Sequence, residues 1–187
     1  NSTLYDKLAM SRPGASDEEL RQMVKLAGAV ILTSQGVPFL HAGMEFCRSK
    51  EGHGNSYQSS DIINQIDWCD RRTYADVNDY YFRLIRLRRN HPLFRISQAE
   101  LIRKNLSFCI KYKVGVVTYC LKGKNTGDSW EQAIVIFNGN REEVRVEVPL
   151  QKYRIIARGE HIDELSAETT EGGEVAVPPV SMMLLAR

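Results

Sequence analysis

The strongest periodic signal in the chain is a run of apolar residues at helical spacing between Ser16 and Gly36. The positions that recur along one face are Leu20, Met23, Val24, Ala27, Val30 and Ile31. Ser16 is a favourable N-cap, and Glu19 three residues later completes a capping box, so we expect the helix to begin here. Gly36 can supply the left-handed stop of the helix, and the apolar carboxyl-terminal half predicts packing against a sheet.

A short apolar run, VPFLHAG at residues 37–43, follows at once and is typical of a buried parallel strand. We expect His41 on this strand to be a hydrogen-bonded core histidine. A second helix is predicted over residues 75–94, with Pro92 ending it. Its inner stripe is Val77, Tyr80 or Tyr81, Leu84 and Leu87. A lone parallel strand cannot satisfy its backbone groups, so residues 1–95 predict the tail of a larger sheet or barrel.

From about residue 96 the pattern changes to short β-branched or aromatic runs separated by Gly, Asn and Pro turns. Alternation is plainest at Val144, Val146 and Val148. Several short strands at this spacing predict an antiparallel sandwich. The predicted fold class is therefore α+β, with an incomplete α/β piece at residues 1–95 and an all-β domain at residues 96–187.

Composition places the chain among ordinary soluble globular proteins. Its 187 residues are 43% hydrophobic and 26% charged, with a formal net charge of +2. The small charge and the lack of a Lys/Arg block argue against a nucleic-acid partner, and the longest apolar run is far short of a membrane span. There is no visible signal peptide, and the chain begins at Asn1 without Met. We expect it to be cut from something longer.

The four cysteines and four histidines are too widely spaced for a zinc site. The cysteines are Cys47, Cys69, Cys109 and Cys120. Free thiols in a reducing compartment, hence a cytoplasmic address, are the favoured interpretation, and a disulfide is the alternative. We expect neither a metal nor a cofactor.

One polar segment, GNSYQSSDIINQIDW at residues 54–68, has neither helical period nor alternation. It is dense in amides, hydroxyls, carboxylates and aromatic rings, and loops of this length inside a compact domain are uncommon unless they are functional. The segment begins just beyond the carboxyl end of the strand predicted at residues 37–43. Ligands bind at that edge in α/β folds, so this loop is the candidate binding surface.

Residues 36–68, GVPFLHAGMEFCRSKEGHGNSYQSSDIINQIDW, resemble the segment that closes the (β/α)8 barrel of α-amylase superfamily enzymes. They are most similar to type I pullulanases, ahead of isoamylase-like and glycogen-debranching enzymes. GVPFLHAGMEF resembles the eighth barrel strand with its Gly-x-Glu exit, RSKEGHGNSYQSSD resembles the loop ending in Asn-Ser-Tyr, and NQIDW follows at the family spacing. NSTLYDKL resembles the segment directly after the seventh-strand His-Asp motif. The resemblance continues through LIRLRRNHPLF into an all-β carboxyl-terminal domain and so covers essentially the whole chain.

The resemblance implies a debranching hydrolase that cuts α-1,6 links in pullulan, amylopectin or glycogen with retention of configuration. Retaining hydrolysis in this superfamily rests on carboxylates after the fourth, fifth and seventh barrel strands. The resemblance puts the last of these, in the His-Asp pair, immediately before Asn1. We therefore expect no catalytic residue in this chain, and no activity from the chain alone.

The resemblance also implies substrate-binding residues. Asp61 and Gln65 have the spacing of an Asp and an Arg that contact sugars in α-amylase relatives. A carboxylate suits two glucose hydroxyls, whereas Gln65 lacks the charge and fork of Arg. The alternative for Asp61 is a cap on a turn or short helix. Asn55 and Tyr57 are expected on the same rim, where Tyr57 either stacks on a sugar ring or anchors the loop with its ring buried.

Other residues near the loop have less direct expected roles. Glu45 and Arg48 are expected to support the cleft rather than to touch sugar. Asp67 and Trp68 are interpreted as a loop-closing pair, with Trp68 in the core. Asn1 would follow the missing Asp and line the cleft.

Two rival hypotheses remain open. In the first, the β domain is an independent α-glucan-binding or structural module of an isoamylase or glycogen-debranching relative, and Trp130 in a connecting loop is its one candidate sugar platform. The strand aromatics are Phe108, Tyr112, Tyr119, Phe137 and Tyr153, and most are expected in the core, which favours a structural domain. The second is a scaffold role, for which the sequence offers no dedicated feature. An incomplete α/β piece would expose apolar surface, so self-association is also expected.

Overall fold

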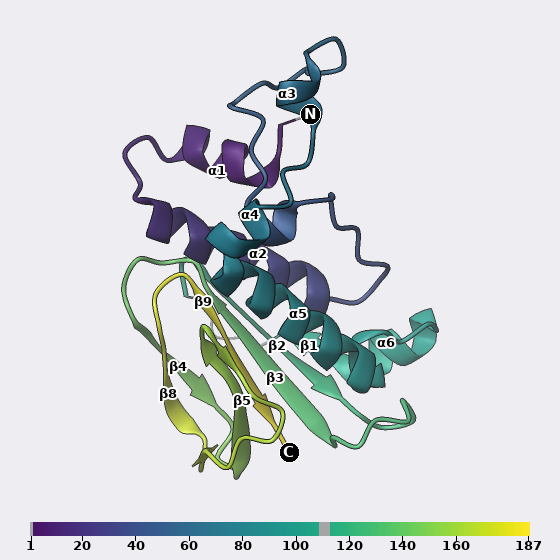
Figure 1. The fold of residues 1–187 in the computed structure, drawn as a ribbon. Helices are drawn as coiled ribbons and strands as arrows, with labels where there is room; N and C mark the ends of the chain where they lie inside the picture. Colours follow the sequence, from purple (N-terminus) through teal and green to yellow (C-terminus); the bar gives the residue numbers. More distant parts are fainter. Residues whose placement is uncertain (1, 109–112) are drawn as a thin grey trace.

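The structure, a computed structural model, describes residues 2–108 and 113–187 (Figure 1). The helical elements are α1 Leu4–Ser11, α2 Asp17–Thr33, the 3-10 turn η1 Met44–Phe46, α3 Asp61–Asn64, α4 Asp70–Thr73, α5 Ala75–Asn90, the 3-10 turn η2 Pro92–Phe94 and α6 Ala99–Asn105. The strands are β1 Leu106–Phe108, β2 Val116–Lys122, β3 Gln132–Asn138, β4 Val144–Val148, β5 Tyr153–Gly159, β6 His161–Ile162, β7 Thr169–Thr170, β8 Gly173–Val177 and β9 Ser181–Ala186.

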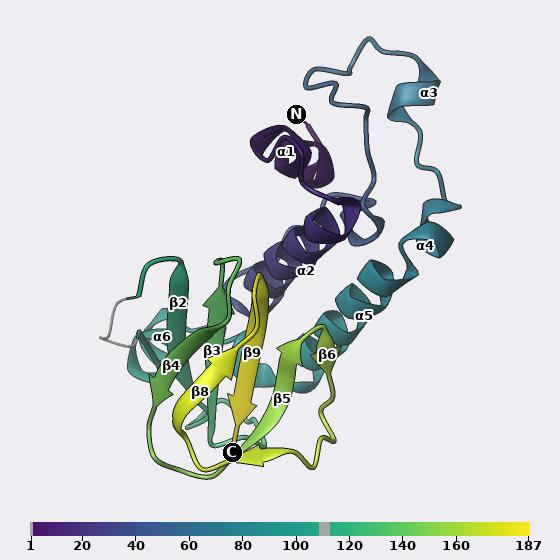
Figure 2. The same ribbon diagram turned by 90° about the vertical axis from the view of Figure 1, so that its left-hand side faces the viewer.

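The strands form one large antiparallel sheet and one two-stranded ribbon. The sheet has the order β1-β2-β3-β9-β5-β6, with β7 paired to β5, and the ribbon pairs β4 with β8. Helices α2 and α5 lie against one face of the sheet and the ribbon covers the other (Figure 2). The antiparallel sandwich predicted after residue 96 is confirmed.

Strand β3 is almost entirely apolar, and its position in the middle of the sheet explains why. Ala133, Val135 and Phe137 belong to the core under the helices, whereas Ile134 and Ile136 belong to the core under the ribbon. Both faces of a central strand are therefore buried, which requires a continuous hydrophobic run. The core under the helices joins residues on both sides of residue 95. The division into an α/β piece and an all-β domain remains a prediction.

Helix α2 begins and ends where the sequence predicts. The Ser16 hydroxyl accepts from the Glu19 amide at 3.2 Å, and the Glu19 carboxylate accepts from the Ser16 amide at 3.0 Å. Ser34 is the C-cap, and Gly36 has the expected left-handed φ of 97°. The inner stripe of α5 is buried, and Pro92 lies just beyond its end. Helices α1 and α6 were not predicted.

Helices α2 and α5 touch closely because the contact is built around a glycine. A Cβ on Gly28 would lie 2.4 Å from Cζ of Tyr81, so a larger residue would displace the ring. The Tyr81 hydroxyl donates to the Val24 carbonyl at 2.9 Å, and burial raises the pKa of Tyr81. This contact fixes the two long helices side by side above the sheet.

The prediction of a buried strand over residues 37–43 is wrong for this chain. These residues are coil and turn, Val37 is 97% exposed and Phe39 is 83% exposed. The prediction of a core histidine is wrong too, since His41 is exposed. Backbone groups of a strand need a partner, and no neighbouring strand in the described residues lies beside this segment.

Several smaller expectations can also be compared with the structure. Cys47, Cys69 and Cys120 are free thiols, while Cys109 and Tyr112 lie outside the described residues. Tyr119, Phe137 and Tyr153 are buried as predicted, but Phe108 is 66% exposed. Within the described ranges, none of the helices has the length and apolar character needed to cross a bilayer.

Candidate functional site

The candidate site is the loop from Gly43 to Trp68, which we call the rim loop. It carries α3 and projects beyond the helices, at the end of the molecule opposite the sandwich (Figures 1 and 2). It returns to the helices through α4 and leads directly into α5. Its position at the end of the molecule leaves most of its side chains in solvent.

The rim loop begins with a sharp turn around η1. Gly43 has a φ of 92°, and a Cβ there would lie 2.6 Å from Cβ of Arg48. Only glycine meets both demands without strain. Phe46 and Cys47 are buried under the turn, and burial raises the pKa of the Cys47 thiol to about 12. That thiol is therefore protonated and unsuited to nucleophilic chemistry.

Arg48 joins the beginning of the rim loop to its end. Its side chain is buried, and its guanidinium donates to the Ala42 carbonyl at 3.4 Å and to the Asn64 carbonyl. The Glu45 carboxylate accepts from the Gly43 amide at 3.1 Å. Both side chains bond to backbone of the loop itself, an arrangement suited to the supporting role predicted for them.

Asn64 holds the middle of the rim loop. Its amide donates to the Ser56 carbonyl at 2.7 Å and to the Ser59 carbonyl at 3.0 Å. Asn64 is the last residue of the single turn α3, which has Ser60 as its N-cap and Asp61 as its first residue. Because Ser60 occupies the cap position, the alternative that Asp61 caps this turn is wrong. The Asp61 side chain is exposed.

The remaining candidate contact residues also face solvent. Tyr57 is 76% exposed, so the alternative of a buried loop anchor is wrong. Asn55 and Gln65 are exposed on the same loop. Asn1 lies outside the described residues. The structure thus brings Asn55, Tyr57, Asp61 and Gln65 onto one projecting loop whose backbone is fixed from within.

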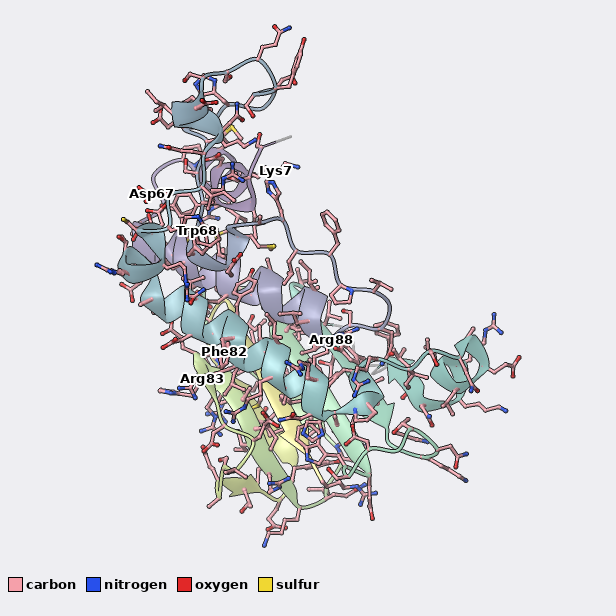
Figure 3. All side chains as sticks on the ribbon, turned by 45° about the vertical axis from the view of Figure 1, so that its right-hand side comes forward. Lys7, Asp67, Trp68, Phe82, Arg83 and Arg88 are labelled. Carbon is pink, nitrogen blue, oxygen red and sulfur yellow. The ribbon has the colours of Figure 1, made fainter. Side chains whose placement is uncertain are left out.

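Asp67 and Trp68 lie at the base of the rim loop, where it meets the helices (Figure 3). The Asp67 carboxylate accepts from the Cys69 amide at 2.8 Å, which turns the chain into α4. Trp68 is 64% exposed, with its ring centroid 5.8 Å from that of Phe46. The prediction of a core Trp68 is therefore wrong.

Trp130 has the opposite outcome, since it is 5% exposed. Its ring stacks on His91 with centroids 3.4 Å apart, and His91 Nδ1 lies 2.9 Å from an Asp128 carboxylate oxygen. A ring covered in this way offers no face to a sugar. In the described part of the chain, no group of three His, Cys, Asp or Glu side chains is arranged to hold a metal ion.

One group outside the rim loop contacts it and was not predicted from the sequence. Asp6 in α1 accepts from the Ser49 hydroxyl at 2.6 Å and from the Lys50 amide at 2.8 Å. The Thr3-x-x-Asp6 spacing is a helix-start signal that would have located α1. It carries no information on the contact between Asp6 and residues 49–50, because that contact is tertiary.

Known proteins that match this chain show the family to which the rim loop and the elements around it belong. The family described as "Pullulanase, all-beta domain" matches residues 102–161. The pullulanase of Bacillus subtilis (strain 168) is 42% identical over 149 residues, which is 80% of this chain and 21% of that protein. The chain belongs to the pullulanase family. It spans only about a fifth of that relative's length.

Solved structures of the pullulanase family extend the match to the whole chain. The pullulanase from Bacillus acidopullulyticus superposes with a TM-score of 0.95 at 37% identity, covering 100% of this chain and 23% of that one. The pullulanase from Paenibacillus barengoltzii, in complex with maltohexaose and alpha-cyclodextrin, superposes with a TM-score of 0.88 at 40% identity. This superposition covers 100% of this chain and 28% of the Paenibacillus barengoltzii chain. The helices, the rim loop and the sheets therefore all have counterparts in pullulanase structures.

Proposed function

We propose that this chain is the part of a pullulanase-type debranching hydrolase that closes the catalytic barrel and adds an all-β domain. The complete enzyme cuts α-1,6-glucosidic links in pullulan, amylopectin or glycogen. The observation that carries the proposal is that the whole of this chain superposes on part of several pullulanases, at 29–40% identity. The complex of one such relative with maltohexaose supports an α-glucan as the ligand.

In the complete enzyme, we assign residues 1–95 to the end of the (β/α)8 barrel and residues 96–187 to the sandwich. The exposure of Val37 and Phe39 supports this assignment, because these apolar side chains would be covered by neighbouring elements of a complete barrel. The same exposed apolar surface accounts for the self-association that we expect from the chain on its own.

The chemistry would be double displacement with retention, performed by two carboxylates about 5 Å apart across the glycosidic bond. Those carboxylates belong to parts of the enzyme outside this chain. The rim loop would supply substrate contacts. Asp61 would accept hydrogen bonds from glucose hydroxyls, Tyr57 would offer its exposed ring to a pyranose face, and Asn55 and Gln65 would add polar contacts. Asn1, which is not part of the rim loop, would add a further polar contact.

A spliced enzyme tests this proposal. The chain is joined to the preceding part of the Bacillus subtilis pullulanase, in place of the matching region of that protein. We expect the spliced enzyme to release reducing ends from pullulan, and the 187-residue chain alone to release none. Sustained, protein-dependent turnover by the chain alone would contradict the assignment of catalysis to residues outside it.

Variants of the spliced enzyme test the residues of the rim loop. Asp61→Asn and Tyr57→Ala each remove a contact made equally in ground and transition states, so KM should rise about tenfold while kcat stays within about twofold. Glu171→Gln, an exposed carboxylate of the sandwich, is the matched control and should leave both constants unchanged. Unchanged KM in both rim-loop variants would contradict a sugar-binding role for this loop.

The alternative function is an α-glucan-binding module in the β domain. Burial of Tyr119, Phe137, Tyr153 and Trp130 favours a structural sandwich instead, because binding modules present aromatic rings in an exposed plane. Titrating the whole chain with maltohexaose separates the two functions. Binding that survives Asp61→Asn and Tyr57→Ala but is lost on Phe108→Ala would favour the module.

A further inference from the structure

The rim loop is not held by its own bonds alone. Asp6 lies in the first turn of α1 and is 5% exposed. Both of its carboxylate oxygens are used by the loop, Oδ1 by the Ser49 hydroxyl at 2.6 Å and Oδ2 by the Lys50 amide at 2.8 Å. Burial by itself would raise the pKa of Asp6, but the bonds from Ser49, Lys50 and Thr3 lower it overall. The carboxylate is therefore ionised at neutral pH and fully engaged.

Ser49 connects the Asp6 carboxylate to a strained part of the rim loop. Its hydroxyl donates to Asp6 and accepts from the Glu51 amide at 2.9 Å. Glu51 has a φ of 51° and Gly52 a φ of 77°, so two consecutive residues lie in the left-handed region. A non-glycine residue in that region costs about 1 kcal/mol or more and persists only where its surroundings enforce it. The Asp6–Ser49 pair supplies that enforcement.

Lys50 connects Asp6 to Ser56, which lies between the candidate contact residues Asn55 and Tyr57. Its amide is held by Asp6, and its ammonium group donates to the Ser56 hydroxyl at 2.8 Å. Ser56 is 4% exposed, although both of its neighbours, Asn55 and Tyr57, are exposed. A buried, hydrogen-bonded residue between two exposed ones sets where the exposed side chains point.

We propose that Asp6 is a positioning residue for glucan binding, which fixes the presentation of Asn55 and Tyr57 through Ser49, Lys50 and Ser56. This inference rests on the proposed function for the role of the loop, but the path from Asp6 to Ser56 does not. Asp6 touches no part of a substrate. Its effect reaches the ligand only through the geometry of residues 49–57.

Hydrogen exchange on the 187-residue chain tests the path without reference to function. Asp6→Ala removes both acceptors, so the hydrogen-bonded amides of Lys50, Glu51 and His53 should exchange about tenfold faster, while amides of α2 and α5 keep their rates. Asp6→Asn should restore slow exchange, because its amide can donate to the Ser49 oxygen and accept from the Lys50 amide. Lys50→Met should accelerate exchange of the Ser59 amide, which donates to the Ser56 carbonyl, and spare the bond from the Lys50 amide to Asp6.

Asp128→Ala is the matched control. The Asp128 carboxylate is also buried and accepts from backbone amides, that of Leu93 at 3.0 Å and that of Trp130 at 2.9 Å, but it lies in the connection between β2 and β3. Its loss should accelerate exchange near residues 91–93 and leave the rim loop unchanged. Equal acceleration of the rim loop in Asp6→Ala and Asp128→Ala would overturn the inference, because both would then report a general loss of stability.

The spliced enzyme tests the consequence for binding. Asp6→Ala and Lys50→Met should raise KM for pullulan about fivefold with kcat nearly unchanged, and Asp6→Asn should return KM to within about twofold of the parent. If Asp6→Ala does not fold, the KM of Lys50→Met, in which Asp6 is intact, tests the same prediction. Faster exchange with unchanged KM, while Tyr57→Ala still raises KM, would overturn the inference and leave the proposed function standing. Unchanged KM in all of these variants, Tyr57→Ala included, would instead count against the proposed role of the rim loop.

Discussion

The core under the helices and the rim loop are built by different means. The core contains large apolar side chains at zero or near-zero exposure, such as Leu84, Tyr81 and Leu184. Beyond Cys47, the rim loop places Ile62 at 75% and Tyr57 at 76% exposure and is held by hydrogen bonds from a few side chains. Apolar burial is spread over many contacts, whereas the loop depends on single bonds. The loop can therefore be disturbed without unfolding the rest.

At the carboxyl end of α2, Arg88 combines burial with hydrogen bonding. It is a buried residue of α5 whose guanidinium donates to the carbonyls of Leu32, Ser34 and Gly36 at 2.6–2.9 Å (Figure 3). These carbonyls lie at the carboxyl end of α2, where backbone acceptors have no partner in the helix. Arg88 thus ends α2 at the point from which residues 37–43 depart.

The largest expected effect separates the two regions by apolar burial. Leu84→Ala should lower the free energy of unfolding by about 3 kcal/mol, since it leaves a cavity in the core. Ile62→Ala removes a similar side chain from the rim loop and should cost less than about 0.5 kcal/mol. Urea unfolding followed by circular dichroism measures both. Similar losses for the two variants would mean that the rim loop is packed as tightly as the core.

The next effect tests the contact between Arg88 and the carboxyl end of α2. Arg88→Met should lower the free energy of unfolding by about 2 kcal/mol, because it leaves buried carbonyls of α2 without a donor. Arg89→Met changes an exposed neighbour and should cost less than about 0.5 kcal/mol. Thermal unfolding of both variants gives the comparison. A loss no greater than that of the Arg89 variant would show that solvent replaces the guanidinium.

A smaller effect depends on pH. Burial would raise the pKa of Asp128, but the bonds from His91, Leu93 and Trp130 lower it overall. A carboxyl whose pKa is lower in the folded state stabilises the fold above its unfolded pKa of about 3.9 and loses that contribution as pH falls through the folded pKa. Asp128→Asn should therefore be less stable than the parent at pH 7 and should lose less stability than the parent between pH 5 and pH 2.

Urea midpoints at several pH values measure this difference. Asp6 and Asp76 also have lowered pKa values, so the variant should keep part of the decline in acid. Parallel curves for parent and variant would contradict the assigned role of Asp128.

The smallest expected effect on stability marks the functional side of the comparison. Tyr57→Ala should change the free energy of unfolding by less than about 0.5 kcal/mol, because its ring is 76% exposed. Tyr81→Phe, which removes only the bond to the Val24 carbonyl, should cost about 1 kcal/mol. Calorimetry on the two variants compares them. A larger cost at Tyr57 would mean that its ring contributes to packing.

The sequence predicted the two regions unequally. Helix boundaries at Ser16 and Pro92 and the alternating strands are local patterns, and the structure confirms them. The positions of Trp68 and His41 were predicted wrongly because an apolar or aromatic residue is buried only where another element covers it. Trp130 illustrates the reverse case, since His91 covers its ring from a distant part of the chain.

By itself, the sequence determined the periodic elements, the antiparallel character of residues 96–187 and the resemblance to pullulanases, because these depend on residue type and spacing along the chain. Only the tertiary structure decided which face of each strand meets the helices and which meets the ribbon. It also decided that residues 37–43 are exposed and that Asp6 anchors the rim loop. Such contacts join residues far apart in sequence, and no local spacing encodes the distance between a carboxylate and an amide more than forty positions away.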